Sequence, residues 1–98
     1  MAQHVETDRT AVVERPENGR FELDFPGGQA FAVYRSDGDR IVVTHSEVPL
    51  AFNGRGLGSQ LAEGIFQIAR ASGRRVVPRC SFVAAWAHRH PGYADVLA

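Results

Sequence analysis

Hydrophobic and polar residues alternate along the first half of the chain. In RFELDF (residues 20–25), Phe21, Leu23 and Phe25 alternate with charged residues, which is the period of an antiparallel strand with one buried face. Three further segments are predicted to be strands: TAVVER (10–15), QAFAVYR (29–35) and RIVVTHSEV (40–48). The turn sequences PENG, PGG and SDGD separate these segments. We therefore expect four strands in an antiparallel meander.

The hydrophobic period changes after Pro49. Aliphatic residues then recur every three or four positions, which predicts a helix of about four turns that ends at Ser72-Gly73. The residues of this stripe are Leu57, Leu61, Ile65 and Ile68. RRVVPRC (74–80) follows as a short strand, and we expect it to return parallel to residues 40–48 in a right-handed crossover. SFVAAWAHRH (81–90) predicts a second helix, and YADVLA (93–98) a short tail.

The predicted order is β-β-β-β-α-β-α, an α+β fold in which an antiparallel meander, a β-α-β crossover and a C-terminal helix build one mixed sheet with helices packed on it. The length of 98 residues supports one hydrophobic core. We therefore expect residues 11–98 to form a single domain, preceded by a flexible N-terminus at residues 1–10.

Composition and charge narrow the classes of function. The 11 basic and 11 acidic side chains balance, so no overall positive field attracts nucleic acid or an anionic membrane. All basic residues are arginines, which excludes a lysine-based P-loop or Schiff base. The single cysteine, Cys80, excludes an internal disulfide, and the first 20 residues lack the apolar core of a signal peptide. We expect a cytoplasmic protein. The sequence carries no signal for its oligomeric state.

A glycine-rich turn precedes the first predicted helix, in FNGRGLGSQL (52–61). The absence of lysine excludes a Walker A loop, and the spacing of Gly54, Gly56 and Gly58 does not fit the dinucleotide fingerprint G-x-G-x-x-G. Glycines before a helix can leave backbone N–H groups open to an anion, beside the roughly half positive charge of the helix N-terminus. The sequence leaves two interpretations open: a diphosphate site, or a turn that only connects strand to helix.

The turn resembles a known motif. Residues 53–58, NGRGLG, resemble the Q/R-x-x-G-x-G/A motif of the GNAT superfamily of N-acetyltransferases, which cradles the pyrophosphate of acetyl-CoA. The resemblance extends to EVP before the turn and to VVP-C-FVA…HP-Y after the helix, over about residues 20–96, and is to a compact single-domain branch. Two features depart from the superfamily pattern. Asn53 replaces Gln or Arg, and the N-terminal helical pair that typically walls in the acceptor is lacking.

The resemblance implies acetyl-CoA as the acetyl donor. We expect no metal, because His88 and His90, two apart on a helix, point to different faces and Cys80 is the single cysteine. The diphosphate of acetyl-CoA would lie at the glycine turn, and its pantetheine arm between the strands at residues 40–48 and 74–80. Backbone groups of Val48 and Leu50 would pair with the pantetheine amides as an added strand does. The residues implied in cofactor binding are Val48, Leu50, Asn53, Gly54, Arg55, Gly56, Leu57, Gly58, Ser59 and Cys80.

Candidate catalytic residues follow from the chemistry of acetyl transfer to an amine, which needs a base to take the amine proton. Glu47 and His45 lie two apart on one strand and project from the same face, so either can serve. Histidine has the better unperturbed pKa, near 6.5. The alternatives are a solvated carboxylate at the end of the strand and a hydrogen-bonded histidine of the sheet.

Cys80 ends the last predicted strand, just before a helix N-terminus that would lower its pKa. It is a candidate acyl acceptor or proton donor to the leaving thiolate, and the alternative is a small residue that lines the pocket. GNAT enzymes often place a tyrosine on the helix after this strand as the general acid, and Trp86 lies on that helix here. An indole N–H supplies no proton at neutral pH, so we predict that Trp86 is a core residue. The cluster Arg74, Arg75 and Arg79 would suit the 3′-phosphate of CoA or form a solvated flank of the strand.

The sequence thus predicts an acetyl-CoA-dependent N-acetyltransferase that acts on an unidentified amine, either a small molecule or a protein amine. The alternative function is a module that binds CoA, or another protein, without turnover. A third interpretation is a structural domain that uses its glycines only for turns.

Overall fold

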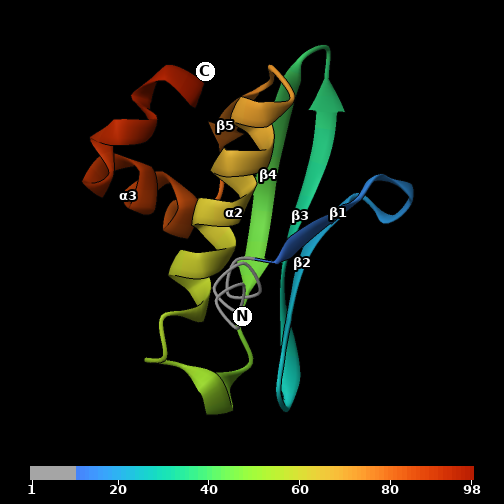
Figure 1. Ribbon diagram of the computed structural model, residues 1–98, viewed down its shortest axis with the longest axis vertical. Coiled ribbons are helices and arrows are strands. Elements are labelled where there is room, and N and C mark those ends of the chain that lie inside the picture. The colour runs from blue at the N-terminus through green and yellow to red at the C-terminus, as the bar shows by residue number, and fades with distance from the viewer. Residues whose placement is uncertain (1–10) are drawn as a thin grey trace, which may run out of the picture.

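The computed structural model describes residues 11–98, so the flexible N-terminus expected at residues 1–10 lies outside the described residues. The elements follow in the predicted order, β-β-β-β-α-β-α (Figure 1). The strands are β1 (Val12–Arg15), β2 (Arg20–Phe25), β3 (Gly28–Asp37), β4 (Arg40–Glu47) and β5 (Arg75–Pro78). The helices are α2 (Leu57–Ala71) and α3 (Ser81–Arg89), joined by the short 3-10 helices η2 (Pro16–Asn18), η3 (Leu50–Phe52) and η4 (Pro91–Val96).

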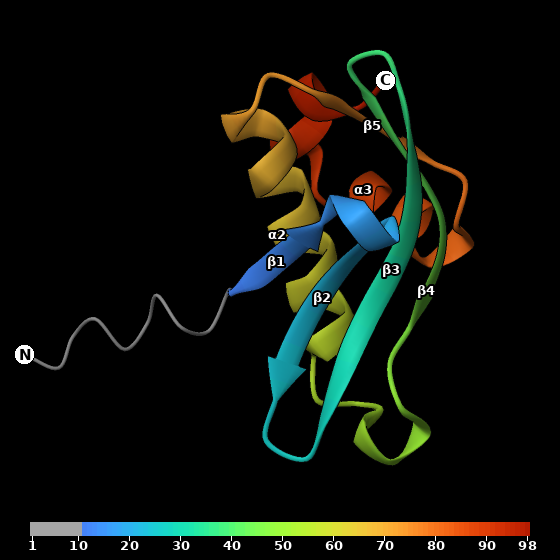
Figure 2. The same cartoon turned by 90° about the vertical axis from the view of Figure 1, so that its right-hand side faces the viewer.

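The sheet has the order β1-β2-β3-β4-β5. Its first four strands pair antiparallel, and β5 pairs parallel with β4, as the crossover from β4 through α2 predicts. Helices α2 and α3 lie on one side of the sheet, and no helix of residues 11–98 covers the other side (Figures 1 and 2). The predicted fold class is therefore confirmed.

The hydrophobic core lies between the sheet and α2. The alternating residues Phe21 and Leu23 of β2 are buried, and so are Leu61 and Ile65 of the predicted helical stripe. The approach of β1 to α2 requires a glycine at position 64, because a Cβ there would lie 2.2 Å from a methyl group of Val12. Periodicity in the sequence thus sets which faces meet, and small residues set how closely they approach.

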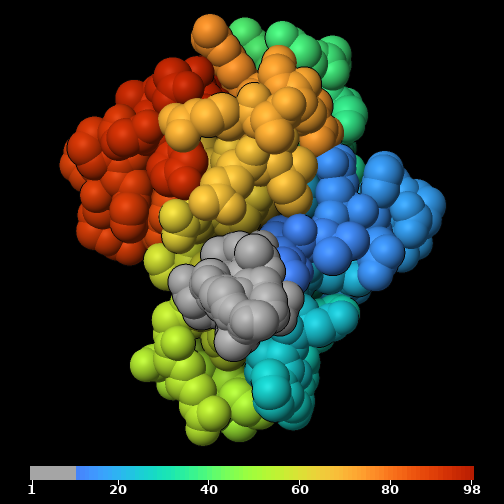
Figure 3. All heavy atoms as spheres, viewed as in Figure 1, coloured from blue at the N-terminus to red at the C-terminus, as the bar shows by residue number. Residues whose placement is uncertain are grey.

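The C-terminal residues, which the sequence predicts as a short tail, are folded against the rest of the protein. They form η4, where Val96 is buried, and the N–H of Ala98 donates to the carbonyl of Val76 at 2.9 Å. In the space-filling view this segment (red) packs directly against α2 (yellow) (Figure 3). The segment therefore covers the outer edge of β5, a short strand that otherwise presents unpaired backbone groups.

The strands β4 and β5 separate at the end where α3 begins. Their last paired residues are Val43 and Pro78, and the N–H groups of Arg79 and Cys80 both donate to the carbonyl of Val43. A register shift between β3 and β4 leaves Thr44 of β4 without a paired residue in β3. Because β4 continues to Glu47 while β5 ends at Pro78, a gap opens between them beyond the last pair. None of the helices within residues 11–98 is long and apolar enough to cross a membrane.

Candidate functional site

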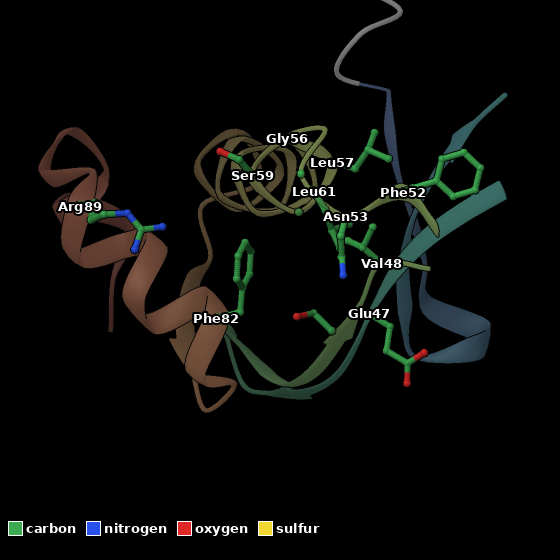
Figure 4. A pocket seen from close by; sticks show the side chains of 13 residues that line it. Glu47, Val48, Phe52, Asn53, Gly56, Leu57, Ser59, Leu61, Phe82 and Arg89 are labelled. Atoms are coloured by element: carbon green, nitrogen blue, oxygen red, sulfur yellow. The ribbon is translucent and has the colours of Figure 1, made fainter. Parts of the chain in front are cut away.

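A cleft of about 400 Å³ lies where the end of β4, the start of α2 and the inner face of α3 meet (Figure 4). Three kinds of structure line it: the last residues of β4, the glycine turn with the first residues of α2, and two side chains of α3. The cleft therefore lies beside the end of β4 that extends past β5, and it has the N-terminus of α2 as one wall.

The glycine turn adopts a backbone conformation that requires glycine. Gly54 has φ +85° and Gly56 has φ +76°, both in the left-handed region that other residues rarely occupy. A Cβ at either position would meet no atom within 4 Å, so the space beside the turn is open. Gly56 is also the N-cap of α2, and no side chain among residues 11–98 caps the start of this helix. The sequence thus leaves this end of α2 bare.

The backbone donors of the turn have no partner among residues 11–98. The carbonyl of Gly56 accepts the N–H of Gln60 at 3.0 Å, which starts the helix. No hydrogen bond within the described part of the chain uses the N–H groups of residues 54–59. The first N–H groups of a helix point out along its axis, toward the positive end of the helix dipole. This arrangement can bind an anion such as a diphosphate.

The turn is anchored by Phe52 at its start. The ring of Phe52 packs edge-on against that of Phe25, with 4.8 Å between the ring centres. A Cβ at Gly27 would lie 2.9 Å from the ring of Phe52. The guanidinium of Arg55 lies 5.1 Å from the centre of the same ring, and its side chain does not line the cleft. The turn between β2 and β3 therefore holds Phe52, and with it the start of the glycine turn, in position.

The opposite wall is α3. Gly58 lets it approach α2, because a Cβ at that position would lie 2.8 Å from the ring of Phe82. The indole N–H of Trp86 donates to the hydroxyl of Ser59 at 2.7 Å, which ties α3 to the first turn of α2. Trp86 is buried and stacks on His90, so its prediction as a core residue is confirmed.

His45 and Glu47 lie on the open face of the sheet. They pair in register with Val33 and Phe31 of β3, whereas Ser46 between them faces the helices beside the core residue Ala32. The ring Nε2 of His45 lies 2.9 Å from a carboxylate oxygen of Glu47, and both side chains are exposed. In Figure 4 the carboxylate of Glu47 points away from the cleft. The two candidate bases thus form one hydrogen-bonded pair on the far side of β4.

Cys80 lies across the gap from β4. Its Sγ is 3.2 Å from the hydroxyl oxygen of Ser46, and the residue is the N-cap of α3. Burial raises the pKa of the Cys80 thiol, but hydrogen bonds from Ser46 and from the backbone of Val83 and Phe82 outweigh it, so the net pKa is lowered. This direction agrees with the prediction from the helix N-terminus. The thiol is therefore more easily ionised than an ordinary cysteine.

Most of the predicted cofactor residues come together around the cleft. Those that line it are Val48, Asn53, Gly54, Gly56, Leu57, Gly58 and Ser59. Leu50, Arg55 and Cys80 do not; Leu50 is 83% exposed, and its carbonyl accepts the N–H of Asn53. The lining residues that the sequence reasoning missed are Ser46, Phe52, Leu61, Phe82 and Arg89. The alternation of the strand could have revealed Ser46, because it lies between the two candidate bases and faces the other way.

None of the three arginines after α2 lines the cleft, and Arg74 and Arg75 lie away from it, whereas Arg79 lies beside Cys80 at the end of β5. Arg74 is at the C-terminal end of α2, whose 15 residues span about 22 Å, while the glycine turn is at the other end. Two nitrogens of Arg74 bind the carboxylate of Glu14 at 2.7 and 2.9 Å. Arg75 lies beside a smaller hollow at the same end. Within residues 11–98, no three His, Cys, Asp or Glu side chains gather closely enough to hold a metal ion.

Comparisons with known proteins agree with this geometry. A model of the GCN5-related N-acetyl-transferase family matches residues 20–96. The chain is similar in fold to a protein from Staphylococcus aureus named a "GCN5-like putative N-acetyltransferase", whose structure was solved by NMR. The TM-score is 0.66 at 21% identity, over 92% of this chain and 89% of that one. No curated protein matches the sequence. The chain therefore belongs to the GCN5-related N-acetyl-transferase family.

Proposed function

We propose that this acetyltransferase uses acetyl-CoA as its donor and transfers the acetyl group to an amine. The observation that carries the proposal is the set of unpartnered N–H groups at residues 54–59, beside a cleft that reaches the gap between β4 and β5. The diphosphate binds these N–H groups, and the glycines allow it to approach closely.

The pantetheine arm follows the gap toward Ser46. Val48 lies just past the end of β4 and lines the cleft, and no hydrogen bond within residues 11–98 uses its backbone N–H or carbonyl. These two groups are therefore available to the pantetheine amides, as in the addition of a strand. Leu50 is a weaker partner because its carbonyl is already bonded. The thioester then lies near Ser46 and Cys80.

The acceptor amine enters from the open face of the sheet, where it meets the pair of His45 and Glu47. The pair takes the amine proton, directly or through water, and the neutral nitrogen attacks the thioester carbon. The bond from that carbon to sulfur breaks, and CoA leaves as a thiolate. The nitrogen loses its second proton to water, and the thiolate takes up a proton from water or from Cys80, which water then reprotonates. A two-step route, with the acetyl group first on the Sγ of Cys80, needs the same residues.

The alternative function, binding of CoA without turnover, has one observation in its favour. The described chain has no element that covers the open face, so His45 and Glu47 are both exposed. The two functions share the glycine turn and differ only in whether an acceptor is used.

Incubation with acetyl-CoA and a panel of small amines, polyamines and peptides tests the proposal through release of CoA thiol. We expect release above the hydrolysis background with at least one acceptor, and a loss of that release in the double variant His45→Ala, Glu47→Gln. Binding of CoA without release for any acceptor would favour the alternative. If neither binding nor release occurs, the glycines serve only the turn. A cytoplasmic location remains a prediction.

A further inference from the structure

Arg89 contributes a positive charge to the cleft that the motif of the glycine turn does not include. It is the last residue of α3, and it lines the cleft on the side opposite the turn. Among residues 11–98 its guanidinium takes part in no ion pair. The side chain of Arg89 projects from α3 on the same side as Phe82 (Figure 4).

The position of Arg89 is fixed by the packing of α3 on α2. Trp86, one helical turn before Arg89, donates its indole N–H to Ser59 in the first turn of α2. Phe82 lies seven residues before Arg89, so both are on one face of α3, separated by about 10 Å along its axis. Phe82 therefore marks the end of the cleft near Cys80, and Arg89 the far end.

Other charged side chains do not take this role within the described part of the chain. Arg55 lies over the ring of Phe52 and does not line the cleft, and Arg74 is paired with Glu14 at the other end of α2. Glu47 is the one acidic residue among those that line the cleft, and its carboxylate points away. Within residues 11–98, the cleft thus has the bare N-terminus of α2 in one wall and an unpaired guanidinium in the opposite wall.

We propose that Arg89 binds a phosphoryl group of the cofactor and so holds its nucleotide end against α3. This inference rests on the proposed use of acetyl-CoA and assigns one side chain to it. A guanidinium forms charge-assisted, often bidentate, hydrogen bonds with phosphoryl oxygens. CoA carries two such groups, the diphosphate and the 3′-phosphate, and both have the chemistry that Arg89 recognises.

Calorimetric titration of wild type, Arg89→Ala and Arg89→Lys with CoA and with dephospho-CoA, which lacks the 3′-phosphate, tests the inference. Arg35→Ala is the matched control, because Arg35 is an exposed arginine of β3 that does not line the cleft. We expect Arg89→Ala to raise the Kd for CoA by about tenfold or more, Arg89→Lys to recover part of the loss, and Arg35→Ala to bind like wild type.

The two ligands identify the phosphoryl group. If Arg89→Ala weakens binding of CoA alone, Arg89 binds the 3′-phosphate, and if it weakens both ligands equally, Arg89 binds the diphosphate. The inference is wrong if Arg89→Ala binds CoA as Arg35→Ala does, or if the lysine variant is as weak as the alanine variant. A wild-type protein that does not bind CoA would instead refute the proposed function.

Discussion

The two ends of α2 differ in how their backbone groups are satisfied. At the C-terminal end, the N–H and the hydroxyl of Ser72 both donate to the carbonyl of Ile68, and the N–H of Arg74 donates to the carbonyl of Ala69. At the N-terminal end, Gly56 supplies no capping side chain, and the N–H groups of residues 54–59 have no partner within the described chain. The C-terminal end of α2 is thus a closed end, whose backbone groups are bonded within the protein. The N-terminal end is an open end, whose N–H groups have no partner among residues 11–98.

The side chains follow the same division. Near the closed end, Arg74 binds Glu14, and Arg70 binds Asp95 of η4. At the open end, Arg55 of the glycine turn and Arg89 of the cleft form no ion pair within residues 11–98. With glycine as the N-cap in place of serine, asparagine or aspartate, α2 loses only roughly a few tenths of a kcal/mol. The C-terminal end of α2 therefore stabilises the fold, whereas the N–H groups at its N-terminal end, unpartnered among residues 11–98, are available to a ligand.

The largest expected effect is at the open end. Gly56→Glu places a side chain and a negative charge in the proposed diphosphate site, so we expect binding of CoA to weaken by more than about a hundredfold in calorimetry. The matched control is Gly38→Glu, because Gly38 also has a positive φ and open space beside it but lies in the turn between β3 and β4. Equal binding by both variants would show that the turn does not hold the diphosphate.

The closed end is expected to affect stability and not binding. Glu14→Gln removes the charge that two nitrogens of Arg74 bind, so we expect the free energy of unfolding in urea to fall by about 1–3 kcal/mol with the Kd for CoA unchanged. Asp95→Asn breaks the exposed pair with Arg70 and should cost at most about 1 kcal/mol. Equal losses of unfolding free energy in the two variants would contradict the difference in burial between the partly buried Arg74–Glu14 pair and the exposed Arg70–Asp95 pair.

The pH dependence of this loss has a defined sign. The hydrogen bond from Arg74 lowers the pKa of Glu14 below its ordinary value of 4.5. At pH values between the lowered pKa and the ordinary one, the unfolded chain therefore binds more protons than the folded protein. The contribution of Glu14 is therefore complete above about pH 4.5 and decreases as the pH falls below that value. The difference in stability between wild type and Glu14→Gln should shrink in the same range, and a difference that grows in acid would be inconsistent with the ion pair.

The smallest expected effect is at the gap between β4 and β5. Ser46→Ala removes a hydrogen bond that lowers the pKa of Cys80, while the burial that raises it remains. The midpoint of the alkylation rate of Cys80 against pH should therefore move upward, whereas Ser36→Ala in β3 should leave it in place. An unchanged midpoint in Ser46→Ala would mean that the two side chains do not interact in solution.

Much of the fold could be predicted because its signals are local. The alternation in β2 and the helical stripe from Leu57 to Ile68 each identify a buried face within one segment, and the crossover rule then places β5 beside β4. The contacts that the sequence did not reveal join distant segments. Arg74 and Glu14 are 60 positions apart, and Ala98 binds the carbonyl of Val76.

The candidate site divides in the same way. The glycine turn could be found from the sequence because φ and the missing Cβ are properties of its own residues, Gly54 and Gly56. The sequence pattern places Phe82 on the inner face of α3, but it does not show that Phe82 and Arg89 line the cleft, because the position of α3 against α2 depends on the contact of Trp86 with Ser59. Local patterns therefore predict where a ligand can bind, and tertiary packing decides which side chains surround it.

The most direct test of the central claim is to follow the backbone amide signals of the protein by NMR during titration with CoA. If the open end of α2 holds the diphosphate, the amides of residues 54–59 shift more than those near Ser72 at the closed end, and dephospho-CoA reproduces their shifts. If these amides do not move while CoA binds, or if CoA does not bind, the account of the glycine turn is wrong.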